Sequence, residues 1–177
     1  MIRRLSLMAV AMVSLIACGG GTTNTNNPPA DDSQTPPITG RVDIEAWIAK
    51  GSYKDWHCEA AVHDARSPSP HGKNRICSND KVSSTTNESY PVGSAGVKEL
   101  YDSTGTSIVG YAVYRKVTDG TGGDSWYWYE RVPLTSAAPH DSNGVVADGM
   151  GSSGQAQSIC VNCHQGANDF VYTRVTP

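Results

Sequence analysis

Five consecutive residues near the end of the 177-residue chain, Cys160-Val161-Asn162-Cys163-His164, constrain its fold more than any other stretch. Cys-x-x-Cys-His is the attachment signature of a c-type haem. Two thiols on one helical turn can each form a thioether with a haem vinyl group, and the next residue offers its imidazole to the iron. We therefore expect one covalent haem c, held by Cys160 and Cys163, with His164 as the proximal iron ligand. A Cys-x-x-Cys dithiol is the alternative, which the adjacent histidine disfavours.

The N-terminus indicates export. Two arginines precede an apolar run that is too short to cross a bilayer as a mature helix. The run ends in Leu15-Ile16-Ala17-Cys18, which resembles the cleavage box of bacterial lipoproteins. We expect a signal peptide at residues 1–17 and lipidation of Cys18, which would anchor the protein in a membrane. An ordinary signal peptide cut nearby is the alternative.

The residue after the lipidation site indicates which membrane carries the anchored protein. Gly19 rather than Asp follows Cys18, which favours the outer membrane over retention in the inner membrane. Haem c is assembled on the outer side of the bacterial inner membrane, so the motif and the signal agree. The expected location is the bacterial outer membrane, lipid-anchored and facing the periplasm.

Composition divides the mature chain in two. Residues 18–40 are rich in Gly, Thr, Asn, Pro, Asp and Ser, which predicts a disordered linker behind the lipid anchor. Residues 41–177 have the length of one domain. Without Arg3 and Arg4 the chain has 12 basic and 17 acidic side chains, a formal charge of −5. It has no basic stripe, so we expect no nucleic-acid partner.

The pattern of apolar residues predicts an α+β fold, mainly antiparallel β-sheet with a short N-terminal helix and a C-terminal helix that carries the haem motif. Consecutive strands joined by short loops form antiparallel hairpins. In the strand at 125–134, Trp126 and Trp128 share one face, and Tyr127 and Tyr129 share the other. We expect helices at 41–50, ended by Gly51, and at 155–166; strands through Cys58 and Val62 and at 73–78, 97–101, 107–117, 125–134 and 170–175; and a connector at 139–154.

The remaining cysteines suggest a disulfide. One of the five cysteines is assigned to the lipid and two to the haem, which leaves Cys58 and Cys77. If their strands pair as a hairpin, the two thiols lie close enough to bond, and the periplasm permits it. Two buried free thiols are the alternative.

The position of the haem motif excludes the small all-helical cytochromes c, which carry it near the start and a methionine ligand downstream. Only residues 165–177 follow His164, and none of them is Met. The wall over the distal face of the haem must therefore come from the β-rich segment.

The ordered motifs resemble the cytochrome P-460 family and its relatives, the β-type cytochromes c-prime. The resemblance covers most of residues 41–177 and implies a dimeric, mainly antiparallel β domain with helices. Its pieces, in order, are Tyr53-Lys54-Asp55-Trp56; Ser69-Pro70-His71-Gly72 through Arg75 to Asn79; Tyr90-Pro91-x-Gly93 to Val97-Lys98-Glu99-Leu100; Gly110 through Lys116 to Asp124-Ser125-Trp126; and the haem motif followed by Asp169-Phe170-Val171-Tyr172-Thr173-Arg174.

The resemblance also implies roles for two residues. Lys98 matches the lysine that hydroxylamine-oxidising members link covalently to the haem ring, which perturbs the macrocycle. The alternative is that Lys98 pairs with a carboxylate on the sheet surface. Arg75 is a candidate distal hydrogen-bond donor to a bound ligand, or else a surface guanidinium.

One departure from the family concerns the distal carboxylate that accepts protons during hydroxylamine oxidation. The matching position is Ala112, and residues 107–117 contain no Asp or Glu. Five other residues could supply a sixth iron ligand, but we expect the four histidines to lie on loops or at the surface and the methionine to lie outside the site. They are His57, His63, His71, His140 and Met150.

Three functions follow from the resemblance and the motif. The leading one is oxidation of small nitrogen species, hydroxylamine toward NO or N2O, with electrons passed to an external redox partner protein. The second is binding of NO or another gas without turnover, as in c-prime-type cytochromes. The third is a lipid-tethered electron-transfer cytochrome with both axial positions filled.

Overall fold

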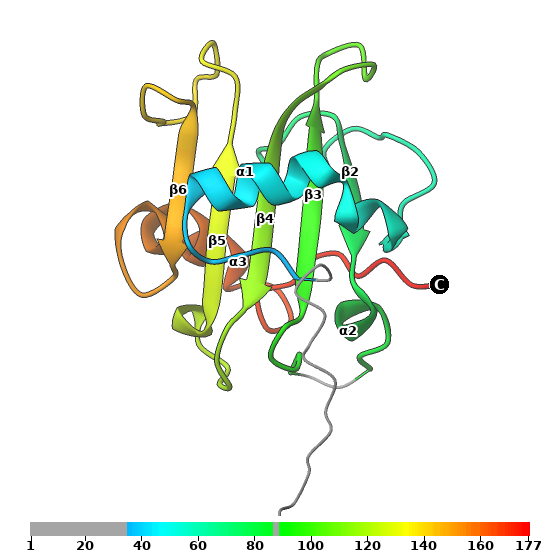
Figure 1. The fold of residues 1–177 in the computed structure, drawn as a ribbon, viewed down its shortest axis with the longest axis vertical. Coiled ribbons are helices and arrows are strands. Elements are labelled where there is room, and N and C mark those ends of the chain that lie inside the picture. The colour runs from blue at the N-terminus through cyan, green and yellow to red at the C-terminus, as the bar shows by residue number, and fades with distance from the viewer. Residues whose placement is uncertain (1–34, 87–88) are drawn as a thin grey trace, which may run out of the picture.

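The computed structural model describes residues 35–86 and 89–177, which form one six-stranded antiparallel sheet with short helices (Figure 1). The strand order follows the sequence, because each strand turns back beside the previous one through a local connection. The predicted α+β class with a mainly antiparallel sheet is therefore confirmed. The strands are β1 (His57–Cys58), β2 (Asn74–Ser78), β3 (Ala95–Tyr101), β4 (Ile108–Lys116), β5 (Trp126–Arg131) and β6 (Val145–Met150).

The predicted signal peptide, lipidated Cys18 and most of the predicted linker lie outside the described residues. The end of that linker belongs to the packed domain, since Pro36 is fully buried and its carbonyl accepts a hydrogen bond of 2.8 Å from Arg115 Nη1. The domain thus begins earlier than residue 41. Within the described part of the chain, no helix has the length and apolar character needed to span a bilayer.

Helix α1 (Arg41–Lys50) crosses one face of the sheet (Figure 1). Its ends are those predicted, because Gly51 takes the left-handed conformation (φ 73°) that terminates a helix. The helix buries Ile44, Trp47 and Ile48 against the sheet, together with Tyr127 and Tyr129 of β5. We call this side of the sheet the α1 face.

The opposite face carries the haem motif. Trp126 and Trp128 pack there against Ala156 and Cys160 of a helical segment, so the predicted separation of the tryptophans from the tyrosines is confirmed. We call this side the motif face. The segment consists of a π-helical stretch, η4 (Ala156–Val161), followed by α3 (Asn162–His164). The remaining short elements are η2 (Ser52–Asp55), α2 (Asp80–Ser83) and η3 (Gly123–Ser125).

Two predicted elements are wrong, and one is shorter than predicted. Residues 139–154 are not a connector throughout, because they contain β6, which pairs with β5. Residues 170–175 form no strand, and only an isolated bridge joins Asn168 and Val171. The first strand covers two residues and ends well before Val62. In each case pairing with a distant segment, rather than local composition, decides whether the backbone joins the sheet.

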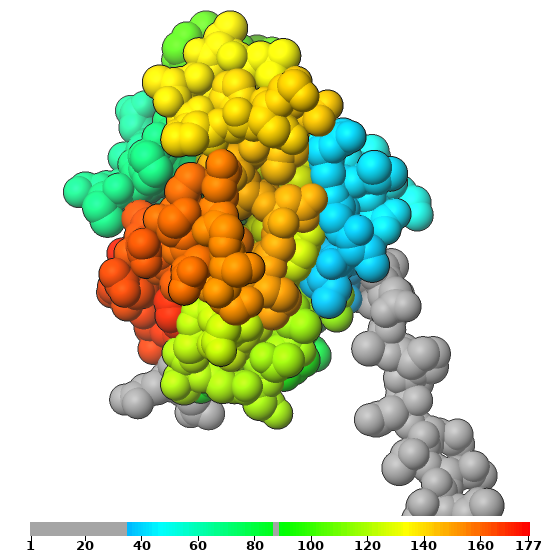
Figure 2. Space-filling model, turned by 90° about the vertical axis from the view of Figure 1, so that its left-hand side faces the viewer, coloured from blue at the N-terminus to red at the C-terminus, as the bar shows by residue number. Residues whose placement is uncertain are grey.

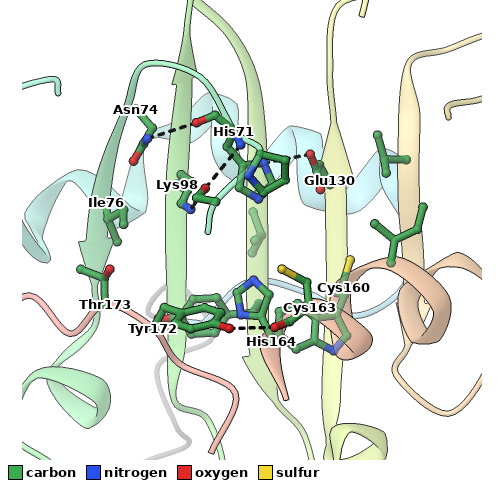
Figure 3. Close-up of a pocket in the computed structure, with 18 of the residues that line it drawn as sticks. His71, Asn74, Ile76, Lys98, Glu130, Cys160, Cys163, His164, Tyr172 and Thr173 are labelled. Atoms are coloured by element: carbon green, nitrogen blue, oxygen red, sulfur yellow. Dashed lines mark hydrogen bonds and ion pairs between the residues drawn. The ribbon is translucent and has the colours of Figure 1, made fainter. Parts of the chain in front are cut away.

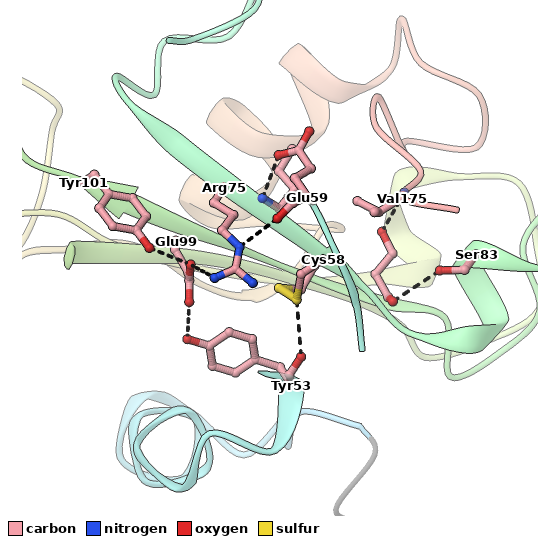
Figure 4. Close-up of a disulfide and its surroundings, with 11 residues drawn as sticks. Tyr53, Cys58, Glu59, Arg75, Ser83, Glu99, Tyr101 and Val175 are labelled. Atoms are coloured by element: carbon pink, nitrogen blue, oxygen red, sulfur yellow. Dashed lines mark hydrogen bonds and ion pairs between the residues drawn. A yellow bond between two sulfur atoms is a disulfide. The ribbon is translucent and has the colours of Figure 1, made fainter. Parts of the chain in front are cut away.

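Cys58 and Cys77 form a disulfide, with an S–S distance of 2.02 Å (Figure 4). They are directly opposite in the β1–β2 pair, which is the hairpin arrangement that the sequence predicted. Cys77 is fully buried in the core of the α1 face. The bond ties the two-residue edge strand, and the long loop that follows it, to the body of the sheet.

Candidate functional site

A cavity of about 260 Å³ lies between the motif face and the helical segment (Figure 3). Its walls come from β2, β3, β4 and β5, from loop residues 66–71, from the helix and from the C-terminal residues Tyr172 and Thr173. Figure 2 shows the helical segment (orange) from outside, packed between the loop before β6 (yellow) and the loop before β5 (yellow-green). The cavity thus joins segments far apart in the sequence.

The three residues of the predicted haem motif line this cavity together (Figure 3). Cys160 is buried and Cys163 exposed, and both thiols are free, so they are not bonded to each other. Burial raises the pKa of the Cys160 thiol to about 12. The helix is wider than an α-helix here, since Asn162 N–H bonds the carbonyl of Gln157, five residues earlier. Such π-helical stretches occur frequently at functional sites.

The imidazole of His164 is held on three sides. Its Nδ1 lies 2.8 Å from the carbonyl oxygen of Phe170, and its ring lies 4.7 Å from that of Trp128 and 5.3 Å from that of Tyr172. Burial lowers the pKa of His164 to about 4, so the ring is neutral near pH 7. A carbonyl only accepts hydrogen bonds, so Nδ1 carries the proton. The lone pair of Nε2 is therefore free to bind a metal.

Lys98 lines the same cavity, from the strand where the sequence placed it. No carboxylate in residues 35–86 or 89–177 lies within ion-pair distance of its Nζ, whose hydrogen-bond partner is Ser69 Oγ at 3.5 Å. Burial lowers the pKa of Lys98. A lysine with a lowered pKa is more often a free amine, which is the nucleophilic form. The alternative of a surface ion pair does not describe this side chain.

Arg75 is not at the cavity, and its predicted role as a distal donor is wrong. Side chains alternate along a strand, so Arg75 points to the α1 face while its neighbour Ile76 points to the motif face. Arg75 Nε donates to the carbonyl of Glu59 at 2.9 Å, and Nη1 lies 3.6 Å from Glu99 Oε2 (Figure 4). The guanidinium joins two parts of the scaffold.

A carboxylate that the sequence analysis missed faces the cavity instead. Glu130 of β5 is 7% exposed, lines the cavity and lies directly opposite Ala112 in the β4–β5 pair. His71 Nδ1 lies 3.2 Å from Glu130 Oε1 (Figure 3). In that view both side chains, with Lys98, lie across the cavity from His164. The alternation in residues 126–130 was the available signal, since it puts Glu130 on the face of Trp126 and Trp128.

The other candidate ligands divide between the cavity and the rest of the molecule. His63 and His71 both line the cavity, and His71 lies on the loop before β2, which agrees with the prediction of a loop histidine. His57 contacts Asp80, and His140 lies on an exposed loop, both away from the cavity. Met150 packs against the core of the α1 face.

Glu59 anchors the loop that covers the cavity. It accepts hydrogen bonds of 2.8 Å from His63 Nε2 and 2.9 Å from the Ile76 amide, and it lies 2.6 Å from Arg66 Nη2. Burial acts to raise the pKa of Glu59, but the bonds from His63 and Arg66 outweigh it and hold that pKa below its usual range. The ionised carboxylate therefore stabilises the folded state.

We expect Glu59→Gln to lower the free energy of unfolding by about 1–3 kcal/mol, because a partly buried acceptor loses charge-assisted bonds. The native contribution is present above the unfolded pKa of about 4.5 and is lost as the pH falls through the lower folded value. Urea unfolding between pH 7 and pH 3 would measure it. The variant should show a smaller loss of stability on acidification than the wild type, and equal losses would contradict this.

The lining residues fit a covalently held haem. Two free thiols at the required spacing and one neutral imidazole meet at a cavity with largely aromatic and aliphatic walls. Trp128 lines the cavity as well, and its ring packs against that of His164.

Fold and site together define a class: a single antiparallel sheet with a cavity on one face, closed by a helix that offers two thiols and an imidazole. Comparison with known proteins adds no narrower identity. No family model matches this chain, and no curated protein and no solved structure matches it either.

Proposed function

We propose that the protein is a c-type cytochrome of the cytochrome P-460 family that binds small nitrogen species and oxidises hydroxylamine toward NO or N2O. The observation that carries the proposal is that Cys160, Cys163, His164 and Lys98 line one cavity. The first three match the attachment signature of haem c. Lys98 comes from a strand more than 60 residues away, so the motif alone does not account for its presence.

The roles of the chain's own residues follow from their contacts. Cys160 and Cys163 would hold the haem through thioethers, and His164 would be the proximal ligand through Nε2. When bound, the haem supplies an iron that can take a small ligand and accept electrons. Lys98 offers an amine whose pKa is lowered by burial, and the free amine is the form that can bond covalently to the ring.

Glu130 and His71 provide the proton chemistry. Oxidation at nitrogen releases protons as well as electrons, so the site needs an acceptor on the side of the cavity opposite His164. Glu130 Oε1 is the acceptor that we assign, and His71 Nδ1 at 3.2 Å holds it in place. The carboxylate that residues 107–117 lack is thus supplied by the neighbouring strand.

We also propose a cellular location, a redox partner and an oligomeric state for the protein. The lipoprotein box at Cys18 supports a lipid-anchored form at the outer membrane, facing the periplasm, where haem c is assembled. Electrons taken from the substrate must leave, so an external redox partner protein is required. The family resemblance adds a homodimer as the expected assembly.

The purified holoprotein tests the proposal. We expect a mass increase corresponding to one covalent haem, retained on denaturation, and reduction of an external electron acceptor when hydroxylamine is added. The variant with both Cys160→Ala and Cys163→Ala should lose the covalent haem. A wild-type protein without haem would refute the proposal, as would one that binds haem but reacts with neither hydroxylamine nor NO.

Lys98→Ala tests the cross-link. We expect the wild type to show a ferrous Soret band shifted far to the red and a haem peptide that contains the β3 segment. The variant should show an ordinary Soret band and a peptide from the Cys-x-x-Cys-His motif alone. Lys73→Ala is the matched control, because Lys73 pairs with the exposed Asp64 and does not line the cavity. An ordinary wild-type spectrum with an open sixth position would instead favour the gas-binding function.

One observation favours the electron carrier as a second candidate. His71 lies at the cavity on a loop, so a histidine is available as a sixth iron ligand. A low-spin six-coordinate spectrum that NO does not change, and that becomes high-spin in His71→Ala, would establish the carrier. An open position in the wild type would remove it.

A further inference from the structure

A buried ion pair joins the sheet to the segment that follows the haem motif. Lys116 Nζ lies 2.6 Å from Asp169 Oδ2, and each side chain is 1% exposed. The same Asp169 oxygen accepts hydrogen bonds from the amide of Tyr90 at 2.7 Å and from Ser89 Oγ at 3.2 Å, and Oδ1 accepts one from Trp126 Nε1 at 3.4 Å. Lys116 comes from the end of β4, and Asp169 lies five residues after His164.

Stability alone gives little reason for such a pair. The cost of removing two charges from water offsets most of their attraction, and apolar residues of similar volume often stabilise a fold as well. The pair does, however, fix the position of the Asp169 carboxylate. Four donors converge on one carboxylate and fix its position relative to the sheet.

The backbone at this point is strained. Asp169 (φ 40°) and Phe170 (φ 65°) both lie in the left-handed region, which residues other than glycine seldom adopt. Backbone of this kind costs about 1–3 kcal/mol per residue and persists only where the surroundings hold it. The carboxylate of Asp169 is the polar anchor of this turn, and Phe170 and Val171 pack against the core of the motif face beside it.

The strained turn carries a contact of the functional site. The carbonyl of Phe170, the residue after Asp169, accepts the hydrogen bond from His164 Nδ1 at 2.8 Å. This bond fixes which ring nitrogen has the proton and how the ring is rotated. The chain of contacts therefore runs from Lys116 to Asp169, along one residue of backbone to Phe170, and from there to the proposed iron ligand.

We propose that the Lys116–Asp169 pair is a positioning device for the proximal ligand. It holds the turn at residues 168–171 so that the Phe170 carbonyl orients the imidazole of His164 and keeps a strong bond to its Nδ1 proton. Such a bond makes the imidazole a more basic ligand, which favours ferric over ferrous iron. The inference rests on the proposed function, because it concerns the ligand of the same site.

The test compares Asp169→Ala and Asp169→Asn with the wild type in the full-length holoprotein. The alanine variant removes the acceptor that holds the turn. Asparagine tolerates left-handed backbone and can still accept from Tyr90 and Trp126, so it keeps part of the anchor without the charge. The readouts are the iron–histidine stretching band of the ferrous protein, by resonance Raman spectroscopy, and the reduction potential.

We expect Asp169→Ala to shift the iron–histidine band to lower frequency and the reduction potential to a more positive value. Asp169→Asn should lie between the alanine variant and the wild type, and it provides the readout if the alanine variant does not fold. Tyr53→Phe is the control, because it removes a buried 2.7 Å bond to Glu99 on the α1 face without touching the turn. The control should leave both readouts unchanged.

The outcomes separate this inference from the proposed function. A wild type with covalent haem, and an iron–histidine band that does not move in either Asp169 variant, would overturn the positioning role and leave the proposed function intact. A band that moves in a haem protein without hydroxylamine turnover would support the positioning role while the oxidation fails. A wild type without haem would overturn both.

Discussion

Glu130→Gln is expected to lower the rate of hydroxylamine oxidation by about 100-fold or more, while the covalent haem and its spectrum remain. A positioned general base contributes about 10²–10⁴-fold to a rate, and glutamine has nearly the same shape but cannot take a proton at physiological pH. Glu130 lines the cavity and lies opposite Ala112 across the β4–β5 pair. Steady-state turnover with an external electron acceptor measures the loss.

A reciprocal exchange distinguishes the position of the carboxylate from its mere presence. Adding Ala112→Glu to Glu130→Gln returns a carboxylate to the same face of the sheet, one strand away, and we expect part of the rate to return. Glu99→Gln is the matched control, since Glu99 is as deeply buried but bonds Tyr53 on the α1 face. Full activity of Glu130→Gln, or an equal loss in Glu99→Gln, would eliminate Glu130 as the proton acceptor.

The features that local sequence determines were predictable. The helix at Arg41–Lys50 ends where a glycine allows the left-handed turn, and the aromatic residues of β5 alternate as the pleat of a strand requires. The hairpin that brings Cys58 and Cys77 together was predicted because the two strands follow one another in the sequence. Each of these depends on residues that are near one another in the chain.

The wrong predictions at the site have two causes: which face of the sheet a strand residue points to, and which residues lie opposite one another on paired strands. The resemblance placed Arg75 at the distal side, but a strand turns each successive residue to the opposite face, and Arg75 is one residue from the right one. The family resemblance places the distal carboxylate on the strand of Ala112, which contains no Asp or Glu. Glu130 occupies the neighbouring position on β5, which only the pairing of the two strands reveals. Sequence position along a single strand does not carry that information.

The missed elements depend on contacts between distant segments. Residues 145–150 contain Asp148 and a glycine at φ 158°, yet they complete the sheet because β5 offers an edge to pair with. The C-terminal residues looked like a strand, but Asp169 is held by Lys116 and turns the chain away from the sheet. The buried charges at Lys116 and Asp169 left no signal in local composition, because either residue alone looks like a surface residue.

Removing the disulfide, with Cys58→Ala and Cys77→Ala, is expected to lower the free energy of unfolding by about 3 kcal/mol. The bond closes a loop with a sequence separation of 19, and the loss of chain entropy in the unfolded state gives an effect of this size. Strand β1 pairs with β2 over only two residues, so few other contacts hold this edge. Urea unfolding of the two proteins, both with haem attached, measures the difference between their free energies of unfolding, with the slope fitted separately for each.

Loss of the disulfide should also loosen the functional site, because β1 anchors a loop that lines the cavity. That loop carries Ser69 and His71, which contact Lys98 and Glu130 in the cavity. Without the bond, amide hydrogen exchange should accelerate in residues 57–73 before it does in the central strands, because local opening follows the weakest contacts. Val42→Ala, at a side chain of α1 that is 70% exposed and does not line the cavity, leaves this bond intact and should leave that exchange unchanged. If the midpoint and the exchange of residues 57–73 both match the wild type, the edge strand is held by its backbone pairing alone.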